Sequence, residues 1–342
     1  MTSDFTPPRV AIYGTGQFGC LIARKLVEKG WPVVAAFNRA GPKVGQDLGR
    51  LAGMDRDLGV FVQDCETADY AAIEADIGLV VTKDAPADNM AAYTRLMQAG
   101  MNVLCHGGGA MYAWDFDPET AAKIDALACA HGVTFTGGGA WDLGRVWPGI
   151  LIAGACTTIH AMEHKSLTNL SAATPASKHL VEAYGVGLNA EAFRKTMDGN
   201  LSPYSFIYRT VPPHVMLGLG FTVTGTSQRT EPIFHDTPTW CNALERDIQP
   251  DESCGMKVIV TAETQEGVTC SGEFMFELAG DRTEYFSWTV DGDASNRIVF
   301  ERINAMGTTV GLMVNRIPDV IAAPPGVQVV AKLGPPKSSA RF

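Results

Sequence analysis

The feature that most constrains this 342-residue chain is a glycine-rich turn near its N-terminus, placed between an apolar run at 9–13 and a helical pattern at 20–29. The turn consists of Gly14, Thr15, Gly16, Gln17, Phe18 and Gly19. In such a turn the first glycine allows a tight bend, the second lets a pyrophosphate approach the backbone, and the third lets the helix pack on the strand. With Gly30 as a stop and a second strand at 32–37, the pattern predicts a dinucleotide site; the alternative is a glycine-rich turn without a ligand.

Composition excludes several classes of protein. With 46% hydrophobic and 19% charged residues the chain can bury a full core and is long enough for two domains. No apolar run approaches the roughly 18 residues of a membrane span, and the start lacks the pattern of a signal peptide, so we expect a cytoplasmic protein. A net charge of −10 argues against nucleic-acid binding. Eight cysteines without a C-x-x-C pair indicate reduced thiols, with neither disulfides nor a metal site.

Residues 1–150 alternate between short β-branched runs and helical patterns. Strands are expected at 9–13, 33–37, 77–82, 103–106 and 133–136, with a helix at 87–99 among those between them. A further helix should begin after Asp117 as its N-cap, with Pro118 in the first position and Gly132 as the stop. This alternation predicts an α/β fold, a Rossmann domain whose doubly wound parallel sheet binds ligands at the carboxyl ends of its strands.

Residues 151–304 have a different character. Strands with polar alternation are expected at 157–169, 257–263, 268–278, 283–290 and 297–300, together with helical stretches at 179–199 and 203–220. We predict a second, α+β domain with a mostly antiparallel sheet that serves substrate binding and dimerisation. A helix at 305–321 should begin a C-terminal segment, 305–342, that packs back on the first domain.

The end of the second predicted strand bears on the choice of cofactor. NAD-binding units carry an acidic residue there, whereas this chain has Asn38 and Arg39. A guanidinium can bind the 2′-phosphate of NADP(H), and Lys43 is near enough in sequence to assist. We therefore favour NADP(H) over NAD(H); the alternative is that Asn38 binds both ribose hydroxyls of NAD. Thr82, at the end of the expected strand 77–82, and His106, at the end of the expected strand 103–106, complete the predicted cofactor residues.

Several segments together resemble the amine dehydrogenase and 2,4-diaminopentanoate dehydrogenase family, whose cofactor domain is that of dihydrodipicolinate reductase. They are the glycine turn, 43–49, 98–104 and 314–326, the last reading VNRIPDVIAAPPG. The resemblance implies a homodimer, a small-molecule substrate, and a hydride delivered to a carbonyl- or imine-derived carbon. It also implies a catalytic glutamate just after the expected strand 103–106. The corresponding position here is Gly108 or Gly109, so the carboxylate is missing.

This missing base puts amine formation in doubt, because ammonium must be bound and deprotonated. We predict an NADP(H)-dependent oxidoreductase that transfers hydride to or from a carbonyl or hydroxyl carbon of a small substrate, cyclic and aromatic ones included. Two alternatives stay open: an amine dehydrogenase or imine reductase, and a non-catalytic NADPH-binding sensor or partner subunit.

Three residues are candidates for proton transfer or substrate orientation. His106 lies at the carboxyl end of the expected strand 103–106, where an imidazole could pass a proton near pH 7, or simply cap the strand. Asp142, beyond the expected strand 133–136, could orient a substrate or form an internal ion pair. His164 lies in Glu163-His164-Lys165, which faintly resembles a proton-donor stretch of dihydrodipicolinate reductases, and strand alternation sends His164 and Lys165 to opposite faces.

Other residues near these strand ends are candidates for substrate binding. Arg145 could pair with a carboxylate. Tyr112 and Trp141 belong to an aromatic group with Trp114 and Trp147 that could form an apolar lid, or fill domain cores. The glycine runs 107–109 and 137–139 could leave room for a bulky substrate or a close cofactor; the alternative is that both turns need a positive φ.

Overall fold

The computed structural model describes residues 6–197 and 203–338 and shows a chain that divides into two units. Unit 1 contains residues 1–143 and 304–342, and unit 2 contains residues 144–303. The boundary lies somewhat before the predicted residue 150, because the segment from Gly144 onwards, including α6 (Trp147–Ala153), packs on the sheet of unit 2.

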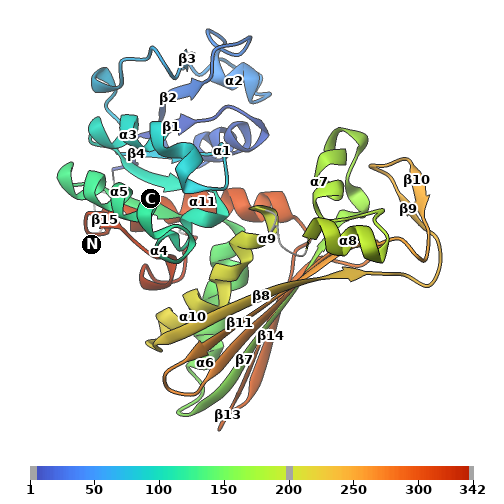
Figure 1. Cartoon of the computed structure of the whole chain (residues 1–342). Coiled ribbons are helices and arrows are strands. Elements are labelled where there is room, and N and C mark those ends of the chain that lie inside the picture. Colours follow the sequence, from blue (N-terminus) through green and yellow to red (C-terminus); the bar gives the residue numbers. More distant parts are fainter. Residues whose placement is uncertain (1–5, 198–202, 339–342) are drawn as a thin grey trace. The chain divides into compact units, whose positions relative to one another are not determined.

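Unit 1 is built on a seven-stranded parallel sheet in the order β15-β6-β5-β4-β1-β2-β3 (Figure 1). Its strands are β1 (Val10–Tyr13), β2 (Val33–Asn38), β3 (Val62–Asp64), β4 (Ile77–Val80), β5 (Asn102–Cys105), β6 (Thr134–Gly137) and β15 (Gly326–Val327). The chain order reverses between β4 and β1, the point where a doubly wound sheet binds its ligands. The sheet confirms the predicted Rossmann fold. Strands β3 and β15 were not predicted from the sequence, since two or three residues are too few to show a period.

Helices cover both faces of this sheet and bury two separate apolar clusters. On one face lie α1 (Gln17–Glu28) and α11 (Ala305–Ala322), and on the other lie α3 (Met90–Gln98) and α5 (Pro118–Ala130). The short helices α2 (Leu48–Leu51) and α4 (Ala113–Phe116) complete the unit. Asp117 caps α5 as predicted, with its Oδ1 accepting from the amide of Thr120 at 3.1 Å.

Unit 2 contains a six-stranded sheet in the order β14-β13-β7-β12-β11-β8. Its strands are β7 (Ile159–Asn169), β8 (Val223–Ile233), β11 (Gly255–Thr264), β12 (Thr269–Glu277), β13 (Tyr285–Gly292) and β14 (Asn296–Glu301). Only β7 and β12 run parallel among these pairs, so the mostly antiparallel sheet is confirmed. A small hairpin consists of β9 (Thr239–Cys241) and β10 (Arg246–Ile248).

The α-helices of unit 2 are α6, α7 (Lys178–Ala183), α8 (Ala190–Met197), α9 (Pro203–Phe206) and α10 (Val211–Leu219). Of these, α6 and α10 each contact several strands of the sheet, and α8 contacts β8. The predicted helical stretch 179–199 is two helices, because Gly185 and Gly187 adopt positive φ between them; its residues 198–199 lie outside the described residues. Strand β8 was missed, since its sequence VTGTSQRTEPI is largely polar.

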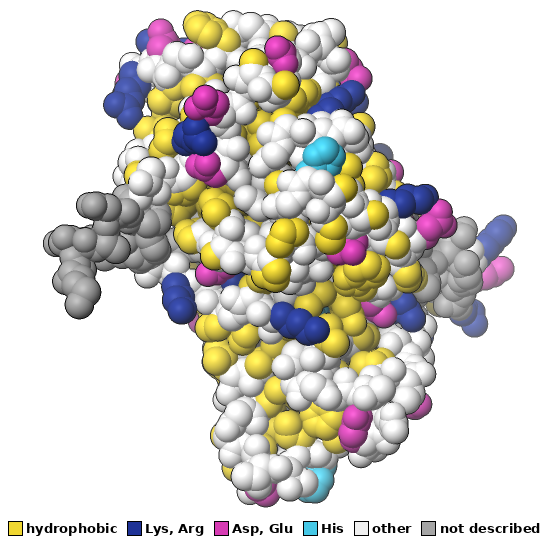
Figure 2. All heavy atoms as spheres, turned by 90° about the vertical axis from the view of Figure 1, so that its left-hand side faces the viewer, with side chains coloured by type: hydrophobic (Ala, Val, Ile, Leu, Met, Phe, Trp, Pro, Cys, Tyr) yellow, Lys and Arg dark blue, Asp and Glu magenta, His cyan; other side chains and the backbone are white. Residues whose placement is uncertain are grey.

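Charged side chains of both signs are interspersed over the surface that Figure 2 shows, without a continuous basic patch. Within residues 6–197 and 203–338 no helix has both the length and the apolar character needed to cross a membrane.

Candidate active site

The glycine turn has the shape that a bound phosphate requires. Gly14 has φ +108°, and a Cβ there would lie 2.9 Å from the carbonyl oxygen of Val81. A Cβ on Gly19 would lie 2.0 Å from the carbonyl oxygen of Gly14, whereas a Cβ on Gly16 would meet nothing within 4 Å. Gly14 and Gly19 are therefore needed by the turn itself. Gly16 leaves open space at the start of α1, where the first amide groups have no intrahelical acceptor.

Polar groups around this open space also suit an anion. The Thr15 hydroxyl is buried and has no hydrogen-bond partner among the described residues. Lys43 lies beside it and donates from Nζ to the Thr15 carbonyl at 2.7 Å. These residues line a pocket of about 330 Å3, which we call the turn pocket, together with Gly16, Gln17, Cys20, Arg24, Leu51, Ala52 and Gly53. A buried hydroxyl without a partner beside two cationic side chains fits a phosphorylated ligand.

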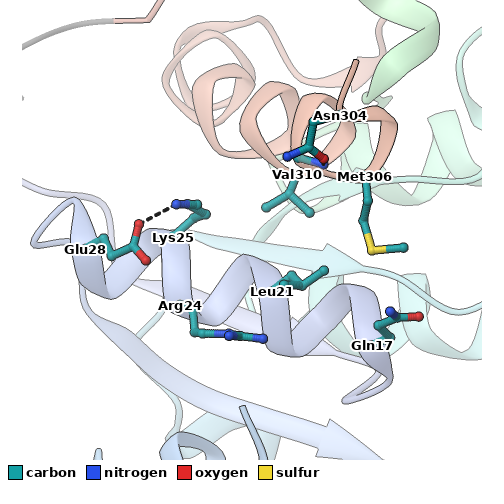
Figure 3. A pocket seen from close by; sticks show the side chains of 9 residues that line it. Gln17, Leu21, Arg24, Lys25, Glu28, Asn304, Met306 and Val310 are labelled. Atoms are coloured by element: carbon teal, nitrogen blue, oxygen red, sulfur yellow. Dashed lines mark hydrogen bonds and ion pairs between the residues drawn. The ribbon is translucent and has the colours of Figure 1, made fainter. Parts of the chain in front are cut away.

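A second pocket, of about 440 Å3, lies between α1 and α11 (Figure 3). Leu21, Met306 and Val310 contribute apolar side chains to it, and Arg24 borders both pockets. Its other cation, Lys25, is paired with Glu28 at 2.5 Å. The turn pocket is thus the better place for a phosphate. Arg24 was not among the predicted site residues; its position as a basic residue two turns into α1 was the signal that the sequence offered.

The residues predicted to bind the ribose lie at the carboxyl end of β2, which is next to β1 in the sheet. Asn38 is the last residue of β2, and its Nδ2 lies 3.4 Å from the carbonyl oxygen of Arg39. The Arg39 side chain is exposed and forms no ion pair within the described part of the chain. Thr82 follows β4, and its methyl group lies against Gly14. The fold therefore gathers the residues predicted to bind a cofactor at one edge of the sheet.

His106 lies at the same edge, immediately after β5. Its amide donates to the carbonyl of Val80 at 3.1 Å, and its ring centroid lies 5.7 Å from that of Phe18 in the glycine turn. Burial lowers the pKa of His106, while the carboxylate of Asp84 raises it in part. Its Nδ1 is buried without a partner among the described residues. Asp84 was missed because an acidic residue in a polar loop carries no distinguishing pattern.

In the glycine runs 107–109 and 137–139, most glycines are explained neither by empty space for a ligand nor by a positive φ. A Cβ on Gly107 would lie 2.6 Å from the carbonyl oxygens of Lys83 and Asp84, and one on Gly137 would lie 2.5 Å from the amide nitrogen of Met111. Only Gly139 in these two runs has a positive φ, +134°. Space at Gly107, Gly109, Gly137 and Gly138 is filled by neighbouring protein atoms. These glycines let loops pack closely; they do not leave room for a substrate.

Asp142 forms a buried ion pair rather than remaining available. Arg316 of α11 donates from Nε to Oδ2 at 2.8 Å and from Nη2 to Oδ1 at 2.6 Å, and neither side chain is exposed. Burial raises the pKa of Asp142 to about 6, and the adjacent guanidinium opposes that rise. Of the two roles considered for Asp142, the structure therefore favours the internal ion pair, because both carboxylate oxygens already accept hydrogen bonds from Arg316.

Two further candidates lie inside unit 2. His164 is fully buried on β7, with ring centroids 4.9 Å from Trp288 and 5.1 Å from Phe274, and burial places its pKa well below the ordinary value. Lys165 lies on the other face and pairs with Glu163 at 3.0 Å, which confirms the alternation. Arg145 is buried against the rings of Tyr208 and Phe286.

Of the aromatic group, Tyr112, Trp114 and Trp141 belong to unit 1 and Trp147 to unit 2. Tyr112 and Trp141 are partly buried, and burial raises the pKa of Tyr112. Their role as a lid, and the substrate roles of Arg145 and His164, stay predictions.

Comparison with known proteins identifies the family to which the chain belongs. Residues 149–340, more than half of the chain, match the model of the 2,4-diaminopentanoate dehydrogenase C-terminal domain. The chain belongs to this family. It is 23% identical over 345 residues to the 2,4-diaminopentanoate dehydrogenase of Acetoanaerobium sticklandii, a match that covers 96% of this chain and 94% of the relative. The resemblance in the sequence is therefore confirmed.

Solved structures agree with this assignment. An amine dehydrogenase from Mycobacterium smegmatis superposes with a TM-score of 0.84 at 30% identity, over 98% of this chain and 99% of that chain. GenD2 from gentamicin A biosynthesis, solved in complex with NAD, has a TM-score of 0.53 at 16% identity, over 89% and 74% of the two chains, and shares the fold. As a member of the 2,4-diaminopentanoate dehydrogenase family, the chain is an NAD(P)-dependent oxidoreductase.

Proposed function

We propose that this member of the family transfers a hydride between NADP(H) and the carbonyl or hydroxyl carbon of a small substrate, with cyclic and aromatic compounds among the candidates. The observation that carries the proposal is the common edge at which the glycine turn, Thr82 and His106 lie, with Phe18 of the turn 5.7 Å from the imidazole. A phosphate-binding turn and a titratable proton carrier are the two groups that this reaction needs from the protein.

Residues of the turn would hold the dinucleotide. The open face of Gly16 and the first amides of α1 suit its pyrophosphate, and the buried Thr15 hydroxyl and Lys43 supply further polar contacts. When bound, the nicotinamide dinucleotide supplies or accepts the hydride. His106 gives a proton to the substrate oxygen during reduction and takes it back during oxidation. The donor in reduction is the protonated imidazole. Burial lowers the pKa of His106 and so disfavours this form, whereas the carboxylate of Asp84 raises the pKa in part and favours it.

Arg39 supports NADP(H) over NAD(H), because it is exposed, unpaired within the described residues and adjacent to Asn38 at the end of β2. Replacing Arg39 with glutamine should weaken NADPH binding about tenfold or more and leave NADH binding unchanged, since only the 2′-phosphate loses a charged partner. Calorimetric titration of both nucleotides into both proteins measures this difference. Equal losses for NADPH and NADH would contradict the assignment of Arg39 to the 2′-phosphate.

An amine dehydrogenase is the second candidate, favoured by the similarity to the Mycobacterium smegmatis enzyme. Against it stands the absence of a carboxylate at Gly108 and Gly109. Asp84 contacts this loop through its backbone carbonyl, which accepts from the Gly109 amide at 3.2 Å.

Reduction of cyclic and aryl ketones with NADPH, measured with and without ammonia, separates the candidates. We expect alcohol as the product whether or not ammonia is present. NADPH consumption that depends on ammonia and yields an amine would establish the second candidate instead. Tight NADPH binding without turnover of any ketone or amine, unchanged in His106→Ala, would support the non-catalytic sensor. The homodimer and the cytoplasmic location stay predictions.

A further inference from the structure

Asn89 is a buried amide, 3% exposed, at the point where the loop after β4 enters α3. Its Oδ1 accepts a hydrogen bond from the Thr82 hydroxyl at 2.6 Å, and its Nδ2 donates to the carbonyl oxygen of Lys83 at 2.9 Å. One side chain therefore fixes two successive residues of the loop that follows β4. Buried amides of this kind hold a loop in one conformation because each lost hydrogen bond would leave a polar group without a partner.

The same amide also reaches the loop that follows β5. Its Nδ2 lies 3.2 Å from the Tyr93 hydroxyl, which donates to the Cys105 sulfur at 3.1 Å. That sulfur in turn accepts from the Gly107 amide at 3.3 Å. His106 is the residue between Cys105 and Gly107, so hydrogen bonds hold the chain immediately on both sides of it.

The two loops are in direct backbone contact. The Gly109 amide donates to the carbonyl of Asp84 at 3.2 Å, and a Cβ on Gly107 would lie 2.6 Å from the carbonyl oxygens of Lys83 and Asp84. The methyl group of Thr82 also lies within 2.9 Å of a Cβ placed on Gly14. A shift of the β4 loop would therefore be transmitted both to the glycine turn and to the loop that carries His106.

We propose that Asn89 is a positioning residue, which joins the loops after β4 and β5 and thereby fixes His106 relative to the glycine turn. The proposal rests on the proposed function of His106 and the turn. Asn89 itself touches neither group; it acts through Thr82, Lys83, Tyr93 and Cys105. Asp84 is the charged group that faces the imidazole, while burial raises the pKa values of Cys105 and Tyr93 and keeps both neutral.

The chain provides a matched control at the opposite edge of the same sheet. Asn102, at the start of β5, donates from Nδ2 to the carbonyl of Asp76 at 2.9 Å and accepts from the Thr134 amide at 2.9 Å. It thus joins β4, β5 and β6 at their amino ends, at the opposite end of the four-residue strand β5 from His106. Loss of Asn102 should cost stability in the same way as loss of Asn89, without moving the carboxyl-end loops.

The test compares Asn89→Ala with Asn102→Ala in three measurements on the full chain: thermal unfolding, the NADPH dissociation constant, and the pKa of His106 from NMR titration, with its signal assigned by His106→Gln. Both variants should unfold at lower temperature. Asn89→Ala alone should weaken NADPH binding about tenfold, because misplaced groups bind poorly. It alone should also raise the pKa of His106 towards its ordinary value, because water reaches a loosened loop.

Asn89→Asp provides a second variant in case the alanine protein does not fold. It keeps an acceptor for Thr82 but loses the donor to Lys83, so it should change NADPH binding in the same direction. If Asn89→Ala or Asn89→Asp matches Asn102→Ala in both NADPH affinity and His106 pKa, the positioning role is wrong. If the unmodified protein binds neither NADPH nor NADH, the proposed function itself fails, which is a distinguishable outcome.

Discussion

Replacing Asp142 with alanine should destabilise the protein by about 3–5 kcal/mol, because Nε and Nη2 of the buried Arg316 guanidinium lose their acceptors and only the partly exposed Asp319 remains as an ionic partner. Both oxygens of Asp142 accept hydrogen bonds from Arg316, at 2.8 and 2.6 Å, and both side chains are 0% exposed. Arg316 also donates to Asp319 at 2.8 Å and to the carbonyl of Gly334 at 2.9 Å. The pair therefore ties the segment after β6 to α11 and to the C-terminal segment. Urea unfolding followed by circular dichroism measures the loss.

Two variants make this expectation specific. Glu119→Ala removes the exposed 2.6 Å pair with Lys123 and should leave the unfolding midpoint unchanged, because exposed pairs contribute little. The double variant Asp142→Leu with Arg316→Met removes both buried charges and should recover much of the stability lost in Asp142→Ala. A single variant as stable as the unmodified protein would show that water enters the site and that the pair is not buried in solution.

Replacing Gly16 with aspartate should abolish dinucleotide binding while keeping the fold. A Cβ at Gly16 meets no atom within 4 Å, and its φ and ψ of −76° and −169° suit an N-cap residue of any type. Aspartate is a favourable N-cap, so the melting temperature should be equal or higher. Its carboxylate would stand where the phosphates bind, so NADPH affinity should fall by at least about 100-fold, or about 2.7 kcal/mol. Calorimetry and thermal unfolding measure the two quantities separately.

The neighbouring glycines and a neutral variant serve as controls. Gly16→Ser adds a cap without a charge and should weaken binding less than Gly16→Asp. Gly14→Val should instead destabilise the fold, since its φ of +108° and the 2.9 Å approach to Val81 exclude a side chain. NADPH binding by Gly16→Asp with unchanged affinity would rule out the turn as the phosphate site.

Local patterns predicted most of what positions the site. The apolar run, the glycine spacing and the start of the next helix placed β1, the turn and α1 correctly, because each depends on residues close together in sequence. The Asp117 cap of α5 was also predictable, since a cap bonds to an amide three residues away. Short or polar strands such as β3 and β8 carried no such pattern, and their partners across the sheet determine them.

The glycine runs show where local reasoning fails. From the sequence, each of these glycines could be explained by backbone freedom or by empty space. The sequence does not show which atoms from other segments of the chain lie against each glycine. At Gly107 these atoms are carbonyl oxygens from the β4 loop, and at Gly137 they are backbone atoms near Met111.

The amino-acid sequence by itself determined the Rossmann fold, the phosphate-type turn and the family, because strand periods, helix ends and glycine spacing act over a few residues. Tertiary structure alone decided which polar groups are free to act. In the folded chain Asp142 pairs with Arg316, 174 residues away in sequence, and the Asn89 side chain contacts the sulfur of Cys105. Such pairings follow from how strands and helices pack, and burial then fixes the charge that each group can carry.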